Sequence, residues 1–166
     1  MIIDVSRFEK IAEYRNGEYK SYMKHHRPHE PFYGVYLINF GGNKNYIGVS
    51  NHLHKRVRQH YSGMVLGNND LPQLNEAYKK AGQFTVFLLN GKKGSGIGED
   101  EFIYALKPSL NRMIPFPNKI SLNSMKEIAS IIGVSLSELV ADEDQTCNKI
   151  RCPHCGADIT IKVELE

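Results

Sequence analysis

Two short apolar segments joined by a glycine-rich turn constrain the fold of this chain more than any other feature. Residues 32–40 combine aromatic and β-branched side chains, and residues 45–49 repeat this composition after the turn Gly41-Gly42-Asn43-Lys44. Such side chains favour extended strands, and short turns that contain glycine and asparagine join antiparallel neighbours. The sequence therefore predicts a β-hairpin over residues 32–49.

The residues after this hairpin alternate between helical and extended patterns. The helices are expected at about residues 52–61, 71–81 and 99–106. A short apolar strand is expected at residues 85–89, in the centre of the sheet. The order β-β-α-α-β-α predicts an α/β fold with a small, three-stranded, mainly antiparallel sheet flanked by helices. We place this domain at residues 32–117.

Three segments flank the predicted domain. Residues 1–31 are expected to form a helical lead-in, because their apolar side chains recur at spacings of three and four. Residues 118–144 are expected to form a helical hairpin. Residues 145–166 are expected to form a cysteine knuckle followed by a strand with alternating apolar residues.

The hairpin carries the tripeptides Gly34-Val35-Tyr36 and Tyr46-Ile47-Gly48, one in each strand. Arg56 follows ten residues after Tyr46, and His60 lies four residues further on, on the same face of the predicted helix. Tyrosines in strands are common, so the tripeptides alone are a weak signal. Their spacing to Arg56 and His60 makes the signal much more specific.

A second set of residues opens the helix predicted at residues 99–106. Glu99 is followed by Pro108 nine residues later and by Asn111 twelve residues later. Together with the hairpin, this register resembles the GIY-YIG nuclease superfamily, over about Tyr33–Asn111. Glu101 competes with Glu99 for the family's metal-binding glutamate, but its spacing to Pro108 and Asn111 is two residues too short.

This resemblance implies a metal-dependent DNA endonuclease of the GIY-YIG fold. Glu99 would offer the hard oxygen ligands that suit Mg²⁺ or Mn²⁺. The fixed fork of Arg56 matches the geometry of a phosphate. A motif tyrosine is the base that the family's mechanism proposes, and His60 would relay a proton or bind phosphate. The expected catalytic residues are Tyr36, Tyr46, Arg56, His60, Glu99 and Asn111, the last in a supporting role.

The charge distribution favours DNA contact by the first part of the chain. Residues 1–120 hold 17 Lys and Arg against 10 Asp and Glu, whereas the remaining 46 residues hold 4 against 8. Positive charge suits a polyanion such as DNA. Lys44, Lys55 and Arg58 are the expected contacts to backbone phosphates. Taken singly, each of these exposed cations would more often be a solvated surface residue.

The helical hairpin at residues 118–144 resembles the closing helices of a phage-repressor-type helix-turn-helix. Its apolar residues, such as Ile128 and Leu139, are also those that any small helical hairpin would bury. Two interpretations stay open: recognition of DNA in the major groove, or docking on the nuclease core or on another chain.

All three cysteines lie in the last 20 residues. Cys152-Pro153-His154-Cys155-Gly156 has the spacing of a zinc knuckle, and Cys147 is a third candidate ligand for a structural Zn²⁺ ion. The identity of the fourth ligand stays open. One alternative is that two chains share one zinc ion in a homodimer. Free thiols at this spacing suggest a reducing, cytoplasmic compartment.

The sequence thus predicts a DNA endonuclease, with a phage or mobile-element role as the first expectation. No apolar run approaches the roughly 18 residues of a membrane span. The alternatives are a restriction or repair nuclease, or a non-catalytic DNA-binding or regulatory protein with a nuclease fold.

The cysteine motif yields the first testable prediction. Protein purified without added metal is expected to contain zinc, because two thiolates at this spacing form half of a tetrahedral site. Elemental analysis measures the zinc content, and Cys152→Ser is expected to lower it. Wild-type protein without zinc would remove the knuckle hypothesis.

Overall fold

The computed structural model describes residues 4–23, 31–94, 97–114 and 120–140, together with the backbone of two short strands near the C-terminus. From the N-terminus, the first elements are η1 (Val5–Arg7), β1 (Glu9–Arg15), β2 (Glu18–Ser21), β3 (Gly34–Asn39) and β4 (Asn45–Ser50). The elements that follow are α1 (Leu53–Leu66), α2 (Pro72–Ala81), β5 (Phe84–Asn90), α3 (Glu99–Leu106), α4 (Leu122–Ile132), α5 (Leu136–Val140), β6 (Ile150–Arg151) and β7 (Asp158–Ile159). None of the described helices is long and apolar enough to cross a membrane.

The predicted hairpin forms as β3 and β4, which pair antiparallel from Gly34 opposite Ser50 to Asn39 opposite Asn45. The central sheet has the strand order β2-β1-β5-β3-β4, and all neighbouring strands in it pair antiparallel. The central position predicted for β5 is therefore confirmed. The sheet has five strands rather than the three expected, because β1 and β2 extend it beyond β5.

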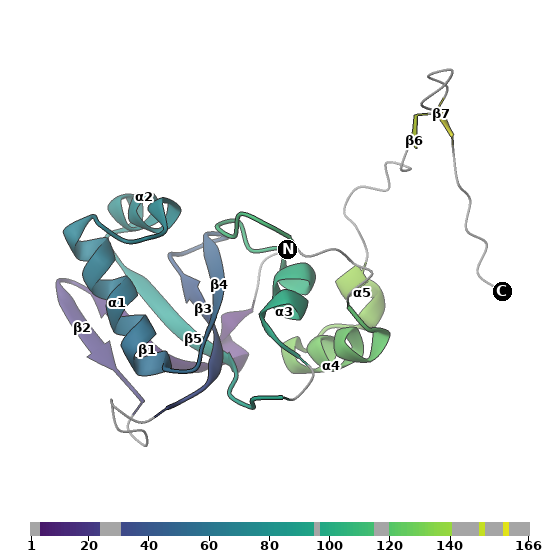
Figure 1. Cartoon of the computed structure of the whole chain (residues 1–166), viewed down its shortest axis with the longest axis horizontal. Coiled ribbons are helices and arrows are strands. Elements are labelled where there is room, and N and C mark those ends of the chain that lie inside the picture. Colours follow the sequence, from purple (N-terminus) through teal and green to yellow (C-terminus); the bar gives the residue numbers. More distant parts are fainter. Residues whose placement is uncertain are drawn as a thin grey trace.

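The two faces of the sheet bury separate sets of side chains. Alternate residues of β3 and β5 point to opposite faces, and both faces are buried, so both strands are apolar over most of their length. One face, which includes Tyr36 and Ile38, is covered by α1 and α2. The other, which includes Val35 and Leu37, is covered by α3, α4 and α5. Figure 1 shows these two groups of helices on either side of the sheet.

The helical lead-in expected at the N-terminus is wrong, since β1 and β2 form a hairpin there. A register shift between Lys10 and Ala12 makes Ile11 an extra residue in β1. Ile11 and Ala12 are therefore both buried, which breaks the alternation of a strand and imitates helical spacing. Asn16 and Gly17 form the two-residue turn, with φ angles of 54° and 80°. Asn-Gly is a strong hairpin signal, and it was the cue in the sequence that favoured strands here.

The helix expected at about residues 52–61 continues to Leu66. Gly63 lies within α1, and a glycine is needed there because the backbone of Asn69 packs against it: a Cβ on Gly63 would lie 2.9 Å from the Asn69 Cα. The helix ends instead at Gly67, whose φ of 73° is left-handed. The N–H of Asn68 then donates to the carbonyl oxygen of Gly63 at 2.8 Å, which turns the chain back along the helix.

The helical hairpin forms as α4 and α5 and packs against α3. Its buried side chains share one core with α3 and with the sheet face that carries Val35. Docking on the core of the domain, the second interpretation of this segment, is therefore what the structure supports. Cys147, Cys152 and Cys155 lie outside the described residues. Of that segment the structure gives only the antiparallel pairing of β6 with β7.

Truncation of Ile128 tests whether α4 belongs to the core. Ile128 is 0% exposed, so Ile128→Ala is expected to lower the free energy of unfolding by about 2–5 kcal/mol. Urea unfolding followed by circular dichroism measures this change. Leu122→Ala is the matched control, since Leu122 on the same helix is 60% exposed and should cost less than about 0.5 kcal/mol. Equal effects of the two substitutions would contradict the shared core.

Candidate active site

Tyr36 lies at the centre of the candidate site, and a glycine makes room for it. Gly48 is its partner across the β3–β4 pair. A Cβ on Gly48 would lie 2.6 Å from the Tyr36 Oη and 3.0 Å from the Tyr46 ring. Only glycine therefore lets the Tyr36 ring lie over β4, with its centroid 6.5 Å from that of Tyr46. The two tripeptides meet through this contact.

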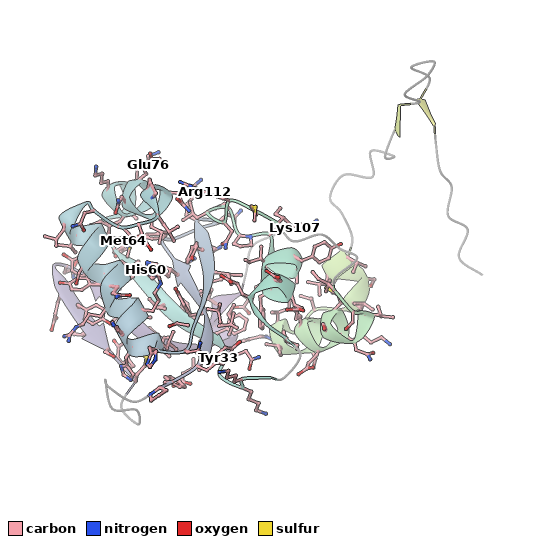
Figure 2. All side chains as sticks on the ribbon, viewed as in Figure 1. Tyr33, His60, Met64, Glu76, Lys107 and Arg112 are labelled. Carbon is pink, nitrogen blue, oxygen red and sulfur yellow. The ribbon has the colours of Figure 1, made fainter. Side chains whose placement is uncertain are left out.

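His60 joins α1 to this tyrosine. Its Nε2 lies 2.9 Å from the Tyr36 Oη in a buried hydrogen bond, and each of the two residues is 1% exposed. The His60 ring is also 5.9 Å from that of Tyr46. Figure 2 labels His60 and Met64, one helical turn apart on α1. Burial, together with the positive charge of Arg56, lowers the pKa of His60 to about 4, so its imidazole is neutral at pH 7.

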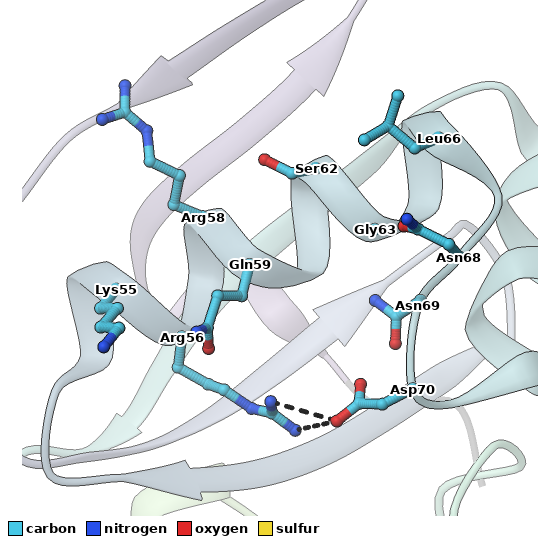
Figure 3. Close-up of a pocket in the computed structure, with 10 residues that line it drawn as sticks. All are labelled: Lys55, Arg56, Arg58, Gln59, Ser62, Gly63, Leu66, Asn68, Asn69 and Asp70. Carbon is cyan, nitrogen blue, oxygen red and sulfur yellow. Dashed lines mark hydrogen bonds and ion pairs between the residues drawn. The ribbon is translucent and has the colours of Figure 1, made fainter.

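Arg56 lies one turn before His60 and is only partly exposed, at 31% of its side chain. Both terminal nitrogens of its guanidinium lie 3.3 Å from Asp70 Oδ2 (Figure 3). Its charge also acts on the hydroxyl groups of Tyr36 and Tyr46. Burial raises the pKa of both tyrosines, and Arg56 opposes that rise. Arg56 is thus the cation that favours a phenolate in this site.

Glu99 begins α3 beside these groups. Burial raises the pKa of its carboxyl, the negative charge of Asp100 adds to the rise, and Arg56 opposes it. The charge of Glu99 in turn raises the pKa of Tyr46, after the larger effect of burial. The competing Glu101 has another task, because its Oε2 accepts a hydrogen bond from the Gly98 N–H at 2.8 Å and caps α3. This contact favours Glu99 as the carboxylate of the site.

Asn111 acts on the backbone of β4. Its Oδ1 accepts a hydrogen bond from the Ile47 N–H, and its Nδ2 donates to the Ile47 carbonyl oxygen, both at 2.8 Å. The N–H of Leu110 donates to the Asn45 carbonyl oxygen at 3.0 Å. Asn111 therefore holds the strand that carries Tyr46 through its backbone.

Two residues that the sequence did not single out complete the site. Asp70 pairs with Arg56, and Asn69 hydrogen bonds to His60. Both lie in the polar loop between α1 and α2. A run of Gly, Asn and Asp is typical of any turn, so nothing in one sequence marked these two as special.

Two of the three expected DNA contacts lie together. Lys55 and Arg58 are exposed on α1 and line an open groove of about 540 Å³ that also contains Arg56 and Asp70 (Figure 3). Lys44 is also exposed but lies in the β3–β4 turn, beside a different hollow. The structure therefore brings Lys55 and Arg58 to the candidate site and leaves Lys44 outside that groove.

No group of three or more His, Cys, Asp or Glu side chains in the described part of the chain is arranged to hold a metal ion. Mg²⁺ does not require such a group. It keeps several water ligands and is often held by one or two carboxylates together with substrate phosphates. Glu99, a partly buried carboxylate beside Arg56, fits that mode of binding.

Comparison with known proteins gives one match. Residues 32–88 match the family model described as the GIY-YIG catalytic domain. The matched segment includes Tyr36, Tyr46, Arg56 and His60. Glu99 and Asn111 lie beyond it. No curated protein and no solved structure matches the chain.

His60 is expected to make the stability of the fold depend on pH. Its pKa falls from an ordinary 6.5 to about 4 on folding, so the unfolded chain binds a proton first as the pH falls. The full contribution to the free energy of unfolding is present above pH 6.5 and is lost as the pH falls toward 4. Between pH 7 and pH 5 this group accounts for about 2 kcal/mol.

Urea unfolding of the wild type and of His60→Gln at these two pH values measures the effect. The wild type should lose about 2 kcal/mol more than the variant between pH 7 and pH 5. The same loss in both proteins would show that His60 is not the titrating group.

Proposed function

We propose that this member of the GIY-YIG nuclease superfamily is a DNA endonuclease that hydrolyses phosphodiester bonds with the help of a divalent metal ion. The observation that supports this most is the set of groups around the Tyr36 hydroxyl. His60 hydrogen bonds to it, and the charges of Arg56 and Glu99 both act on it. These residues come from β3, α1 and α3, so only the fold brings them together.

Hydrolysis of a phosphodiester needs an oriented water molecule and stabilisation of an anionic transition state. We assign the orientation of the water to Tyr36, supported by His60. Burial raises the pKa of Tyr36, so its hydroxyl is protonated at neutral pH and can hold the water by a hydrogen bond. Its action as a base requires nearby positive charge, and Arg56 supplies one such charge.

Arg56 is assigned to the scissile phosphate. Its guanidinium is already partly desolvated and can form two parallel hydrogen bonds to phosphate oxygens. Without DNA, Asp70 holds the guanidinium through an ion pair, and the side chain of Asp70 is 62% exposed. An exposed pair of this kind is worth little, about 0–1 kcal/mol, so a phosphate can replace the carboxylate. Tyr46, which is less buried than Tyr36, is assigned to contact with the substrate.

Glu99 would hold the metal ion, with Mg²⁺ or Mn²⁺ as the expected species. A bound ion would stabilise negative charge on the phosphate and on the leaving oxygen. Glu99 contributes a carboxylate at the start of a helix, where burial raises its pKa and the positive charge of Arg56 opposes that rise.

DNA is the proposed partner along the groove beside α1. Lys55 and Arg58 line this groove, and we assign them to contacts with backbone phosphates, which would fix the position of the duplex without reading its sequence. A phage or mobile-element role, a cytoplasmic location, a homodimer and a zinc ion in the C-terminal segment stay predictions from the sequence.

Plasmid cleavage tests the proposed activity. The wild type with Mg²⁺ is expected to nick or linearise supercoiled plasmid, whereas Glu99→Ala and Arg56→Ala should each lower the rate by about 100-fold or more. Gel electrophoresis of the products over time gives the rates.

The controls are matched in chemistry. Glu101→Ala removes a neighbouring carboxylate that caps α3, and Arg112→Ala removes an exposed arginine labelled in Figure 2. Both should retain cleavage. If Glu101→Ala is inactive while Glu99→Ala is fully active, the metal ligand is assigned wrongly. A wild type that cuts neither plasmid, phage nor branched DNA would favour the non-catalytic alternative.

A further inference from the structure

Asn69 contacts His60 on the side of the ring away from Tyr36. It lies in the loop between α1 and α2 and is 9% exposed. Its Nδ2 lies 3.2 Å from the His60 Nδ1 and 3.2 Å from the His60 carbonyl oxygen. Its Oδ1 accepts a hydrogen bond from the main-chain N–H of Leu71 at 3.0 Å. The side-chain amide is thus held at both ends.

The main chain determines which end of this amide faces the imidazole. A peptide N–H can only donate and a peptide carbonyl can only accept. The amide oxygen must therefore face Leu71, and the NH₂ group must face the carbonyl of His60. The opposite orientation would lose both hydrogen bonds and bring like groups together in a buried place. The NH₂ group has two hydrogens, so one remains for the His60 Nδ1.

The orientation of Asn69 in turn selects one tautomer of His60. Since Nδ1 faces a donor, it must carry the lone pair, and the single proton of the neutral ring must be on Nε2. Nε2 lies 2.9 Å from the Tyr36 Oη. His60 is consequently the donor in this hydrogen bond, and the tyrosine oxygen is the acceptor.

We infer that Asn69 is a positioning residue, which fixes His60 as a hydrogen-bond donor to Tyr36 and prevents it from accepting the tyrosine proton. The role in catalysis rests on the proposed nuclease function, whereas the tautomer is a property of the folded chain alone. A donor at this place stabilises negative charge on the tyrosine oxygen. It also leaves the hydrogen of the Tyr36 hydroxyl for the water or the substrate.

The backbone around Asn69 is arranged to keep it there. Gly63 on α1 lies so close to the loop that a Cβ would be 2.9 Å from the Cα and 3.1 Å from the Cβ of Asn69. The left-handed Gly67 and the bond from Asn68 to the Gly63 carbonyl fold the loop onto the helix. Asn75 on α2 donates to the carbonyl of Gly67 at 3.3 Å. The loop is therefore held from both helices.

The charged and titratable groups around His60 come from each element packed against it. They are Tyr36 on β3, Tyr46 on β4, Arg56 on α1 itself and Asp70 in the loop. Arg56 disfavours a second proton on the ring, and Asp70 favours one. The carboxylate of Asp70 is well exposed and is paired with Arg56. Its effect on the pKa of His60 is therefore smaller than the lowering by burial and by Arg56, and the ring stays neutral at pH 7.

Nuclear magnetic resonance measures the tautomer directly. Long-range proton–nitrogen correlation spectra of the ¹⁵N-labelled full chain at pH 7 distinguish protonated from unprotonated ring nitrogens, and His60→Gln identifies the signals of His60. We expect a neutral His60 with its proton on Nε2. A proton on Nδ1, or on both nitrogens, would overturn the inference whatever the variants do.

Asn69→Asp supplies the complementary test. The carboxylate can only accept, so His60 should take a proton on Nδ1, either as the other tautomer or as an imidazolium. Asn68→Asp is the matched control, because it adds the same charge at the preceding, exposed residue and should leave the Nε2 tautomer in place. An unchanged tautomer in Asn69→Asp would contradict the role of Asn69. Circular dichroism verifies that each variant is folded, and Gly63→Ala, which displaces Asn69 without a new charge, serves if Asn69→Asp does not fold.

Cleavage assays then separate the two proposals. Asn69→Asp should cut plasmid about 10- to 100-fold more slowly, and its pH profile should gain an inflection from His60 near neutrality. If the wild type has the Nε2 tautomer of His60 but does not cleave DNA, only the nuclease function is contradicted. If Asn69→Asp cleaves plasmid at the rate of the wild type and with the same pH profile, only the positioning role is contradicted.

Discussion

Tyr36 packs directly against the backbone of Gly48, and the other parts of the candidate site are placed by that contact. The missing Cβ on β4 lets the tyrosine ring lie against the backbone of Gly48, where its hydroxyl reaches His60 on α1. Once the ring is there, His60 must be at that turn of α1 and Arg56 at the one before it. The strand pairing thus fixes the helix side chains through one aromatic ring. The tripeptides Gly34-Val35-Tyr36 and Tyr46-Ile47-Gly48 therefore form a single packing unit.

The N-terminal hairpin, β1 and β2, also packs against α1, through the aromatic ring of Tyr61. Tyr14 on β1 and Tyr19 on β2 have ring centroids 5.4 and 4.6 Å from that of Tyr61, the neighbour of His60 in α1. Aromatic contacts of this kind add about 0.5–1.5 kcal/mol beyond the burial of area. The two strands that enlarge the sheet therefore also support the middle of α1.

The parts of the fold that could be predicted from the sequence are those with a regular period or a fixed spacing. The β3–β4 hairpin, the central β5 and the start of α3 at Glu99 were expected and are present. The N-terminal hairpin was missed because the extra residue Ile11 disrupts the strand alternation. Asn69 was missed for a different reason. Its importance comes from a contact with His60 across nine residues of chain, which a helix, a glycine and a turn create together.

The attachment of Asn111 to β4 has a consequence for the chain in concentrated solution. β4 is an edge strand, and its outer backbone groups would otherwise be open to pairing with a strand of another molecule. The amide of Asn111 imitates a neighbouring peptide group and occupies the N–H and the carbonyl of Ile47, while Leu110 occupies the carbonyl of Asn45. A short loop without the regular structure of a strand thus covers the first half of this edge. The same side chain that holds the strand carrying Tyr46 in place therefore also blocks strand addition at this part of the sheet edge.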